Sequence, residues 1–361
     1  MTAFMSQKKR IYLDYAATVP MLDVAREACL QGLDQWANPS SPHADGRAAG
    51  AMLEKARQRL KSALDWDGEV IFTSGASEAI RLALKQTKLV RQLVSPVEHD
   101  VVLRFSQGAT ILPVDANGMV SPVQLDDMLK NGEGQALVAV QSVNNETGVM
   151  QDMEAIIKVT RDQGAVLFAD CAQSAGKMPL PDADLIAIGA HKFGGPPGVG
   201  ALLVKDLQVL HATGGQEQGY RSGTQNLPYI IAMVAALEAP ANWMERAEEL
   251  RAQLDNAIKA EGGEIIAENA PRIATIGSYH MPGVAANTQL IKFDMAGFSV
   301  SAGSACSSGT LKPSHVLGAM GIDEKSAREV IRVSIGRDTS RSDIYDFIEQ
   351  WKSIYSAARG A

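Results

Sequence analysis

The sequence lacks the features that mark secreted, membrane-spanning and metal-stabilised proteins. Its three cysteines, Cys29, Cys171 and Cys306, are odd in number and form no CxxC pair. This argues against a disulfide framework or a structural zinc site, and for a reducing compartment. No run of about 18 apolar residues is present, so no membrane-spanning helix and no membrane partner are expected. The first ten residues are polar and lack the apolar core of a signal peptide, so the expected location is the cytoplasm.

The sequence also lacks an excess of positive charge. Lys and Arg number 34 and Asp and Glu number 41, which gives a formal net charge of −7. Nucleic acid is therefore not expected as a partner. Hydrophobic residues make up 46% and charged residues 21% of the chain, as in ordinary globular enzymes. At 361 residues the chain is long enough for about two domains and a sizeable core.

Strand-like and helix-like stretches alternate from the N-terminus to about residue 204. Strands are expected at residues 11–13, 70–73, 93–94, 110–114, 136–143, 166–169, 185–188 and 201–204; helices are expected at 22–36 and 46–64, after 74–78 as far as about 88, from about 121, and at 153–163. This alternation predicts a mostly parallel sheet covered by helices on both faces. Ligands of such sheets bind beyond the carboxyl ends of the strands.

The pattern changes from about Thr224. Helices are expected at residues 227–237, 243–260 and 342–355, with short strands at 265–266, 272–276 and 330–335. We therefore predict a large domain over residues 15–238 and a smaller α+β domain over residues 1–14 and 239–361.

A loop dense in glycine and proline follows the expected strand at 185–188 and contains His191 and Lys192. Such a loop cannot be the interior of a helix or a strand. A lysine at the end of a buried strand should be partly desolvated, which lowers its pKa and makes the neutral amine available as a nucleophile or base. From the loop alone, a Schiff-base lysine and a surface lysine in a hairpin-like connection are equally good interpretations.

Other polar clusters follow other expected strands. Residues 74–78, Ser-Gly-Ala-Ser-Glu, form either a phosphate site at a helix start or an ordinary helix cap. Asp170 ends a buried strand, where it could pair with a protonated pyridine nitrogen or cap the next turn. Residues 98–100 and 144–148 are uninformative by themselves, and the second group could be a simple turn.

In combination these clusters are far more specific than any one of them. They offer a lysine for a Schiff base, a helix start for a phosphate, an aspartate for a ring nitrogen and a histidine that could stack on a ring. Pyridoxal 5'-phosphate (PLP) needs these four groups.

The chain resembles the cysteine desulfurases of the fold-type I, class V aminotransferase family over almost its whole length. The matching motifs, in order, are Tyr12-Leu-Asp-Tyr-Ala-Ala-Thr18, Asn38-Pro-Ser-Ser41 with His43, Phe72-Thr-Ser-Gly-Ala-Ser-Glu78, Glu98-His99, Asn144-Asn-Glu-Thr-Gly148, Asp170-Cys-Ala-Gln173, His191-Lys192, Arg221-Ser-Gly-Thr224, Gly303-Ser-Ala-Cys306 and Ile331-Arg332-Val-Ser334. The resemblance implies a PLP-binding large domain with a mostly parallel mixed sheet, and a smaller α+β C-terminal domain.

The resemblance also implies a role for each residue of the cofactor site. Lys192 would bind PLP covalently and move protons. Asp170 would pair with the pyridine nitrogen, Gln173 would bind the phenolic oxygen, and His99 would stack on the ring. The phosphate would be held by Ala76, Ser77, His191 and, from a second subunit, Thr224, which implies a homodimer.

The substrate of such an enzyme is L-cysteine, whose carboxylate Asn145 and Arg332 would bind. The thiolate of Cys306 would attack the substrate sulfur, leaving L-alanine and a persulfide for delivery to an acceptor protein. The alternative for Cys306 is a free cysteine that packs as a small hydrophobic residue. Cys29 is expected in the core and Cys171 beneath the cofactor, so neither has this role.

The sequence departs from the family pattern at Gly189, where a serine usually contacts the phosphate, and in residues 216–220, where a second histidine is common. Housekeeping relatives that serve iron–sulfur cluster assembly dock a scaffold protein through a longer C-terminal tail, whereas this sequence stops at Ala361. Two other functions remain open: another class V enzyme, such as an aminotransferase or a selenocysteine or cysteine-sulfinate lyase, and a degenerate PLP protein kept for binding or regulation.

Overall fold

The computed structural model of the chain describes residues 10–303 and 313–360, and the chain divides into two compact units. We call Thr18–Asn144 with Met150–Ala241 the sheet unit, and residues 1–17, Asn145–Val149 and Asn242–Ala361 the terminal unit. The boundaries at 14/15 and 238/239 remain predictions from the sequence.

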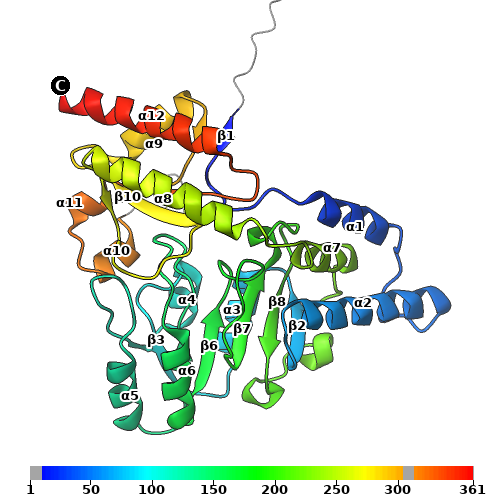
Figure 1. Cartoon of the computed structure of the whole chain (residues 1–361). Coiled ribbons are helices and arrows are strands. Elements are labelled where there is room, and N and C mark those ends of the chain that lie inside the picture. Colours follow the sequence, from blue (N-terminus) through cyan, green and yellow to red (C-terminus); the bar gives the residue numbers. More distant parts are fainter. Residues whose placement is uncertain (1–9, 304–312, 361) are drawn as a thin grey trace, which may run out of the picture. The chain divides into compact units, whose positions relative to one another are not determined.

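The sheet unit contains a seven-stranded sheet in the order β2-β8-β7-β6-β5-β3-β4 (Figure 1). Its strands are β2 (Glu69–Thr73), β3 (Arg91–Val94), β4 (Thr110–Ile111), β5 (Ala136–Ala139), β6 (Val166–Asp170), β7 (Leu185–Gly189) and β8 (Gly200–Val204). Only β8 runs against its neighbours, β2 and β7. The mostly parallel mixed sheet expected from the sequence is therefore confirmed.

The central strands are buried because helices cover both faces of the sheet. Alternate residues point to opposite faces, so Leu167 and Ala169 of β6 join one apolar core while Val166 and Phe168 join the other. The first core includes side chains of α1 (Asp23–Leu33), α2 (Ala44–Ala63), α5 (Pro122–Lys130), α6 (Met153–Asp162) and α7 (Leu227–Leu237); the second includes α3 (Ala76–Lys85) and α4 (Asp100–Phe105). The expected cover on both faces is thus present.

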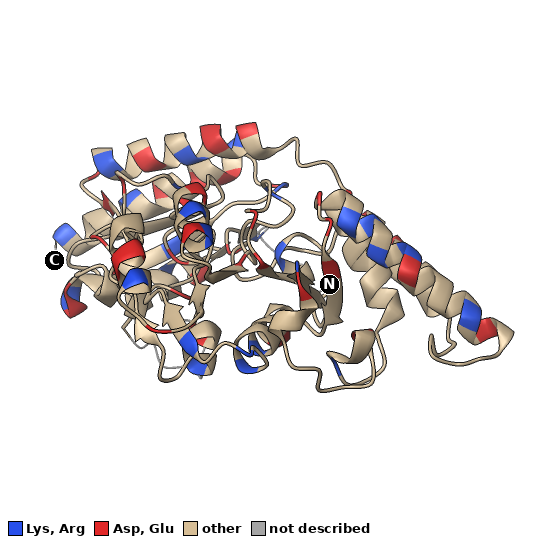
Figure 2. Ribbon diagram, turned by 90° about the horizontal axis from the view of Figure 1, so that it is seen from below, with Lys and Arg blue, Asp and Glu red and all other residues tan. Residues whose placement is uncertain are grey.

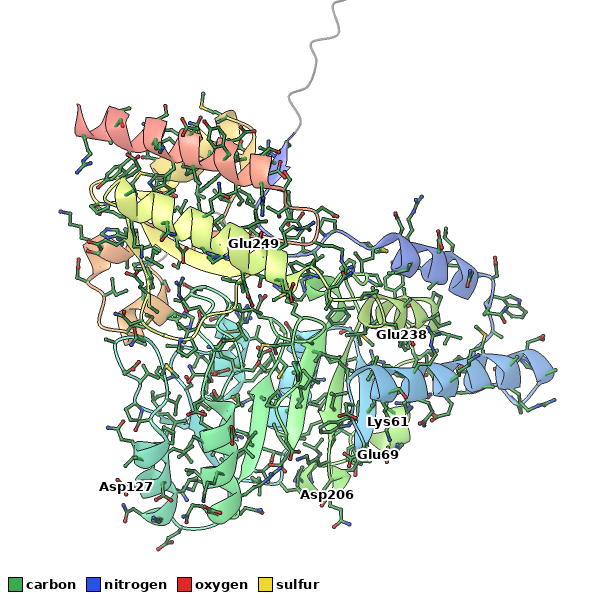
Figure 3. All side chains as sticks on the ribbon, viewed as in Figure 1. Lys61, Glu69, Asp127, Asp206, Glu238 and Glu249 are labelled. Atoms are coloured by element: carbon green, nitrogen blue, oxygen red, sulfur yellow. The ribbon has the colours of Figure 1, made fainter. Side chains whose placement is uncertain are left out.

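The charged side chains of the sheet unit lie mainly around this core. Acidic and basic residues are interspersed along the ribbon (Figure 2). Glu238, which follows α7, accepts a hydrogen bond from Arg59 Nε of α2 at 2.9 Å (Figure 3). Glu69, at the start of β2, accepts one from Gln218 Nε2 at 2.8 Å. In the part of the chain that the structure describes, no helix is both long and apolar enough to span a bilayer.

The terminal unit is an α+β structure with its own core. Its strands are β9 (Glu264–Ile265), β10 (Ile276–His280) and β12 (Val330–Ser334), antiparallel in the order β12-β10-β9, and the parallel pair β1 (Ile11–Tyr12) and β11 (Phe298–Ser299). Its helices are α8 (Met244–Ala260), α9 (Ala286–Met295), α10 (His315–Ala319), α11 (Glu324–Ala327) and α12 (Arg341–Arg359). Phe293 of α9 stacks on Phe347 of α12 with ring centroids 4.7 Å apart, and both belong to the apolar core of this unit.

Several elements differ from those expected. The strand expected at 272–276 begins only at Ile276, because Ile273 N donates to Gly148 O instead of pairing within the sheet. β5 ends at Ala139, although Val140 N and Ser142 N still donate to the carbonyls of β6. The sequence patterns did not indicate α4, α9, α10 or α11. α9 is preceded by Ala285, which offers no side-chain cap and hence no start signal.

Candidate active site

The parallel strands of the sheet unit end at one edge, and the predicted cofactor residues follow these ends. Ala76 and Ser77 follow β2, His99 follows β3, and Lys192 follows β7. Asp170 is the last residue of β6, with Gln173 three residues later. Because these strands are parallel, their carboxyl ends lie at the same edge of the sheet. The topology therefore brings together clusters that are far apart in the sequence.

The start of α3 has open backbone amides that can bind an anion. Its capping residue, Gly75, has φ +146° and makes no side-chain cap, so the first amides of the helix have no acceptor within it. A Cβ on Gly200 would lie 2.7 Å from the carbonyl carbon of Gly75, so only glycine lets β8 approach this turn. Ser77 is exposed in the first turn of the helix. These groups can bind a phosphate.

Glu78 holds the turn before α3 in an arrangement close to a capping box. Its Oε2 accepts a hydrogen bond from Ser74 N at 2.5 Å, and its carboxylate also accepts from Arg221 Nε at 3.1 and 3.3 Å. Burial alone would raise the pKa of Glu78, but the Ser74 and Arg221 contacts outweigh it and lower that pKa. The carboxylate therefore stays ionised and fixes the turn that precedes α3.

The glycine-rich segment between β7 and β8 joins two antiparallel neighbours, so the hairpin-like connection considered from the sequence is real. Lys192 ends a single 3₁₀ turn, η1 (Ala190–Lys192), and is half-buried rather than a free surface lysine. Gly195 N donates to Ala190 O at 2.9 Å and Ala190 N donates to Val199 O at 3.1 Å. These bonds fix the backbone that presents the lysine.

His191 is fixed from both its ring and its backbone. Its Nδ1 lies 3.2 Å from Thr18 Oγ1, and its carbonyl accepts from Val19 N at 2.8 Å. Burial, together with the charge of Lys192, lowers the pKa of His191 to about 4. Its imidazole is thus neutral at physiological pH unless an anion is bound beside it.

Asp170 is a buried carboxylate in an environment that would favour a cationic partner. It is 7% exposed, and its Oδ1 accepts one hydrogen bond, from Ala172 N at 2.9 Å. Burial raises the pKa of Asp170, while the Ala172 amide and the charges of His99 and Lys192 act in the opposite direction. A protonated ring nitrogen would relieve this cost of burial.

His99 and Gln173 complete the set at this sheet edge. Nδ1 of His99 accepts from Val101 N at 3.2 Å as the cap of α4, so in the neutral ring the proton is on Nε2. Gln173 is buried, and its carbonyl accepts from Lys177 Nζ at 3.0 Å. Sequence reasoning missed Lys177: burial and the nearby Lys192 lower its pKa to about 7. It lies four residues after Gln173, one turn along the chain.

The two described cysteines differ in burial. Cys171 is fully buried, and burial raises the pKa of its thiol to about 12, so it is protonated and unreactive at neutral pH. Cys29, on α1, is only half-buried and packs against the edge of the core. Cys306 lies outside the described residues.

The segment before α7 is anchored by two ion pairs within the sheet unit. Arg221 binds Glu78, and its Nη1 donates to Gly223 O at 3.1 Å, next to the exposed Thr224. Glu217 is 5% exposed and accepts from both terminal nitrogens of Arg57, at 2.9 and 3.2 Å. No motif in the sequence indicates this second pair, which joins residues 160 positions apart.

The two predicted carboxylate-binding residues, Asn145 and Arg332, belong to the terminal unit. Arg332 is 5% exposed; its Nη1 donates to Asn145 O and its Nη2 to Asp14 Oδ1, both at 2.9 Å. Its Nε and the Oδ1 of Asn145 are buried with no hydrogen-bond partner among the described residues. A buried guanidinium that keeps an unused donor is suited to a carboxylate.

Comparisons with known proteins agree with these features. The aminotransferase class-V family matches residues 11–347 of the chain. An IscS-like cysteine desulfurase of Mycobacterium tuberculosis is 34% identical, over 97% of this chain and 97% of that protein. Two solved structures are each 28% identical. A NifS-like protein from Rickettsia africae has a TM-score of 0.89 and covers 96% of this chain and 99% of that one. SspA in complex with cysteine has a TM-score of 0.77 and covers 90% and 98%.

Proposed function

The chain belongs to the aminotransferase class-V family, and we propose that it is a PLP-dependent cysteine desulfurase that converts L-cysteine to L-alanine. One observation supports the proposal most directly. A lysine, a buried aspartate, a histidine and a helix start with open amides all follow strands that end at one edge of the sheet. The relatives named cysteine desulfurase match nearly the whole chain, which supports the same activity.

The residues present fit PLP in their chemistry. Lys192 would hold the cofactor through Nζ and move a proton at the α-carbon of the substrate. Asp170, whose burial raises its pKa, would gain a further cationic partner in the ring nitrogen. The amides of Ala76 and Ser77, with His191, would bind the phosphate; Gln173 and His99 would orient the ring. When bound, PLP supplies an electron sink for negative charge at the α-carbon of an amino acid.

The substrate is proposed to bind through its carboxylate to Arg332 and Asn145, whose buried Nε and Oδ1 are unused. The thiolate of Cys306 would then attack the substrate sulfur: the new S–S bond forms as the C–S bond breaks, and its electron pair goes to the carbon that a proton later completes as alanine. The sulfur stays on Cys306 as a persulfide for an acceptor protein. This role for Cys306 rests on the sequence motif and family membership.

We propose a homodimer in which Thr224 reaches the phosphate bound by the partner subunit. Thr224 is exposed in the single chain, and Arg221 fixes the turn beside it. The large domain of residues 15–238 would then hold the cofactor, and the remainder the substrate carboxylate. The cysteine content supports a reducing location, the cytoplasm.

The proposal predicts that the purified protein, supplied with PLP, cysteine and a thiol reductant, forms alanine and sulfide in equal amounts. Lys192→Ala and Cys306→Ser should abolish both products, and mass spectrometry should find a persulfide on Cys306 after cysteine is added. Cys29→Ser is the matched control and should behave as wild type. Unchanged sulfide release by Cys306→Ser would refute the desulfurase mechanism, and transamination without sulfide would identify another class V activity.

A further inference from the structure

The sheet unit contains a cavity that the proposed function does not use. It has a volume of about 710 Å³, which is within the range of about 300–1,000 Å³ that is typical of small-molecule sites. Three parts of the sheet unit line it: the end of α2 with the turn that follows, the segment after Gln173, and the end of α7 with the residues beyond it. The lining residues are 63–67, 176–182, Leu237, Ala239 and Ala241. We call this space the Lys177 cavity, after the basic residue in its lining.

Hydrogen bonds and close packing hold two walls of the cavity in place. Trp66 is 8% exposed; its backbone N donates to Lys61 O at 2.9 Å, and its Nε1 donates to Glu69 O at 3.0 Å. In the second wall, Gly176 has φ +72°, and a Cβ at this position would lie 2.9 Å from Phe193 Cβ. Only glycine allows this turn to pack so closely on Phe193. The backbone of both walls is therefore fixed before any ligand binds.

Lys177 is a half-buried lysine without a carboxylate partner. Its Nζ donates one hydrogen bond, to the backbone carbonyl of Gln173 at 3.0 Å. Among residues 10–303 and 313–360 this amine makes no other hydrogen bond and no ion pair. Because an ammonium group has three donors, two of them are unused. Burial, together with the charge of Lys192, lowers the pKa of Lys177 to about 7, so the charged amine would be stabilised by an anion.

The rest of the lining combines apolar side chains with carboxylates. The apolar side chains can contact the hydrocarbon part of a ligand. The larger ones are Leu64, Trp66, Met178, Leu180 and Leu237. Two exposed carboxylates, Asp65 and Asp67, also line the cavity, and a third, Asp182, is already held in ion pairs by two basic residues outside it. A ligand with one negative charge can pair with Lys177, whereas these aspartates would repel a second negative charge.

We propose that the Lys177 cavity binds an organic monocarboxylate with an apolar body. The carboxylate accepts hydrogen bonds from the two unused donors of Lys177 Nζ, and the body lies against the apolar lining. Such charge-assisted hydrogen bonds are about twice as strong as neutral ones. The lining includes none of the residues assigned to PLP or to cysteine. The inference therefore goes beyond the proposed function and does not depend on it.

Binding of the carboxylate needs the charged amine, so the affinity should follow the protonation of Lys177. Above about pH 7 the free amine loses its proton, and each further pH unit should weaken binding about 10-fold while the bound amine stays charged. The other charged groups that face the cavity are Asp65, Asp67 and Asp182, and an ordinary carboxylate titrates near about pH 4. Lys192 acts on the amine from the cofactor site, and Lys177→Met separates its effect from that of Lys177.

The test uses the full-length protein with PLP present and follows ligand binding by NMR titration. The probe is hexanoate, with 1-hexanol as its uncharged counterpart and adipate as its dicarboxylate counterpart. Hexanoate should bind saturably at about pH 6.5 and about 10-fold or more weakly at about pH 8.5. Adipate should bind less tightly than hexanoate, and 1-hexanol should bind weakly with no pH dependence.

Lys177→Met should weaken hexanoate binding about 10-fold or more, as expected when hydrogen bonds to a charged group are lost. Lys158→Met is the matched control and should bind as wild type, because Lys158 is 74% exposed and pairs with Asp162. Ala239→Trp should also block binding, because it fills the cavity and leaves the amine in place. Thermal unfolding checks that each variant is folded.

Absence of saturable hexanoate binding by wild type would overturn the inference. So would equal binding of 1-hexanol or adipate, or wild-type binding by Lys177→Met. Hexanoate binding that survives Lys177→Met but is lost in Arg332→Gln would place the probe at the proposed substrate site instead. Wild-type binding by Ala239→Trp would count against the cavity even if Lys177→Met fails to fold. Because no arm measures sulfide or alanine, an inactive wild type that binds hexanoate overturns only the proposed function.

Discussion

The buried ion pair between Arg57 and Glu217 should be among the most costly polar contacts in the chain to break. The side chain of Glu217 is 0% exposed and that of Arg57 12% exposed. The carboxylate accepts four hydrogen bonds: two from Arg57, one from Phe72 N at 2.8 Å and one from Gln225 Nε2 at 2.8 Å. Glu217 also has φ +48°, an unfavourable backbone angle for a residue that is not glycine.

Glu217→Gln keeps the shape and removes the charge, which leaves the Arg57 guanidinium buried against a neutral amide. Removing one partner of a buried pair costs about 3–5 kcal/mol. Glu54 also accepts from Arg57 Nε, at 3.2 Å, from a side chain that is 57% exposed. Because this second carboxylate partly compensates the guanidinium, we expect the lower end of that range, about 3 kcal/mol.

The assay is urea unfolding of wild type, Arg57→Ala, Glu217→Gln and the double variant, which together give the coupling free energy of the pair. Glu238→Gln is the matched control, since Glu238 also pairs with an α2 arginine, Arg59, but both side chains are 39% exposed. That exposed pair should contribute less than about 1 kcal/mol. A coupling below about 0.5 kcal/mol for Arg57 and Glu217, or equal losses in Glu217→Gln and the control, would refute the reasoning.

Three other substitutions test the candidate cofactor site at the carboxyl ends of the strands. Gly189→Ser should tighten PLP binding about 5-fold, roughly 1 kcal/mol for one hydrogen bond. Its Cβ would lie 3.3 Å from Ala76 Cβ, a tight contact that a small shift at the start of α3 would relieve. Equilibrium binding should show no gain for Gly189→Ala. Asp170→Asn removes the charge that a protonated ring nitrogen would need. Turnover of cysteine should therefore fall about 100-fold or more, as it does when other charge-stabilising groups are removed. Near-normal turnover would exclude the pairing of Asp170 with the ring nitrogen. Burial, together with the charge of Lys192, lowers the pKa of Lys177 from the ordinary value of 10.5 to about 7. The unfolded chain therefore binds this proton more tightly, and the stability due to this group should rise from pH 7 to about 10.5. Lys177→Met should gain most in unfolding free energy near pH 7, and a gain that does not shrink towards pH 10.5 would contradict the shift.

Much of the site could be predicted because the residues concerned follow strands. The strands at 166–170 and 185–189 are continuous apolar runs, and parallel strands deliver whatever follows them to one edge. Asp170 and Lys192 could thus be grouped without a structure. The loop sequence alone left a Schiff-base lysine and a surface lysine in a hairpin-like connection as equal interpretations. The structure has a feature of each, because the connection joins antiparallel neighbours while Lys192 is half-buried.

The parts that could not be predicted depend on contacts between distant residues. Arg332 meets Asp14 across 318 positions, and Ser314 meets Glu146 across 168. No local period or cap marks Asp14 or Glu146 as a partner, since each follows an ordinary strand-like or turn-like stretch. The helix α10 is capped by the same Ser314 whose hydroxyl binds Glu146. A capping serine can be recognised in the sequence, but its hydrogen bond to Glu146 cannot.

The proposed phosphate site and the segment that contains Thr224 are joined by polar contacts. Glu78, in the first turn of α3, binds both Ser74 and Arg221, and Glu217 binds the β2 amide of Phe72. β2 leads directly into α3, so the two ion pairs fix the segment against the strand and helix of the proposed phosphate site. Thr224 is proposed to serve the partner subunit, whereas α3 serves its own. Glu217→Gln should therefore weaken PLP binding in a dimer more than the loss of stability in one subunit would explain. If the PLP affinity falls only in proportion to the unfolding free energy, the proposed phosphate site and the Thr224 segment are independent.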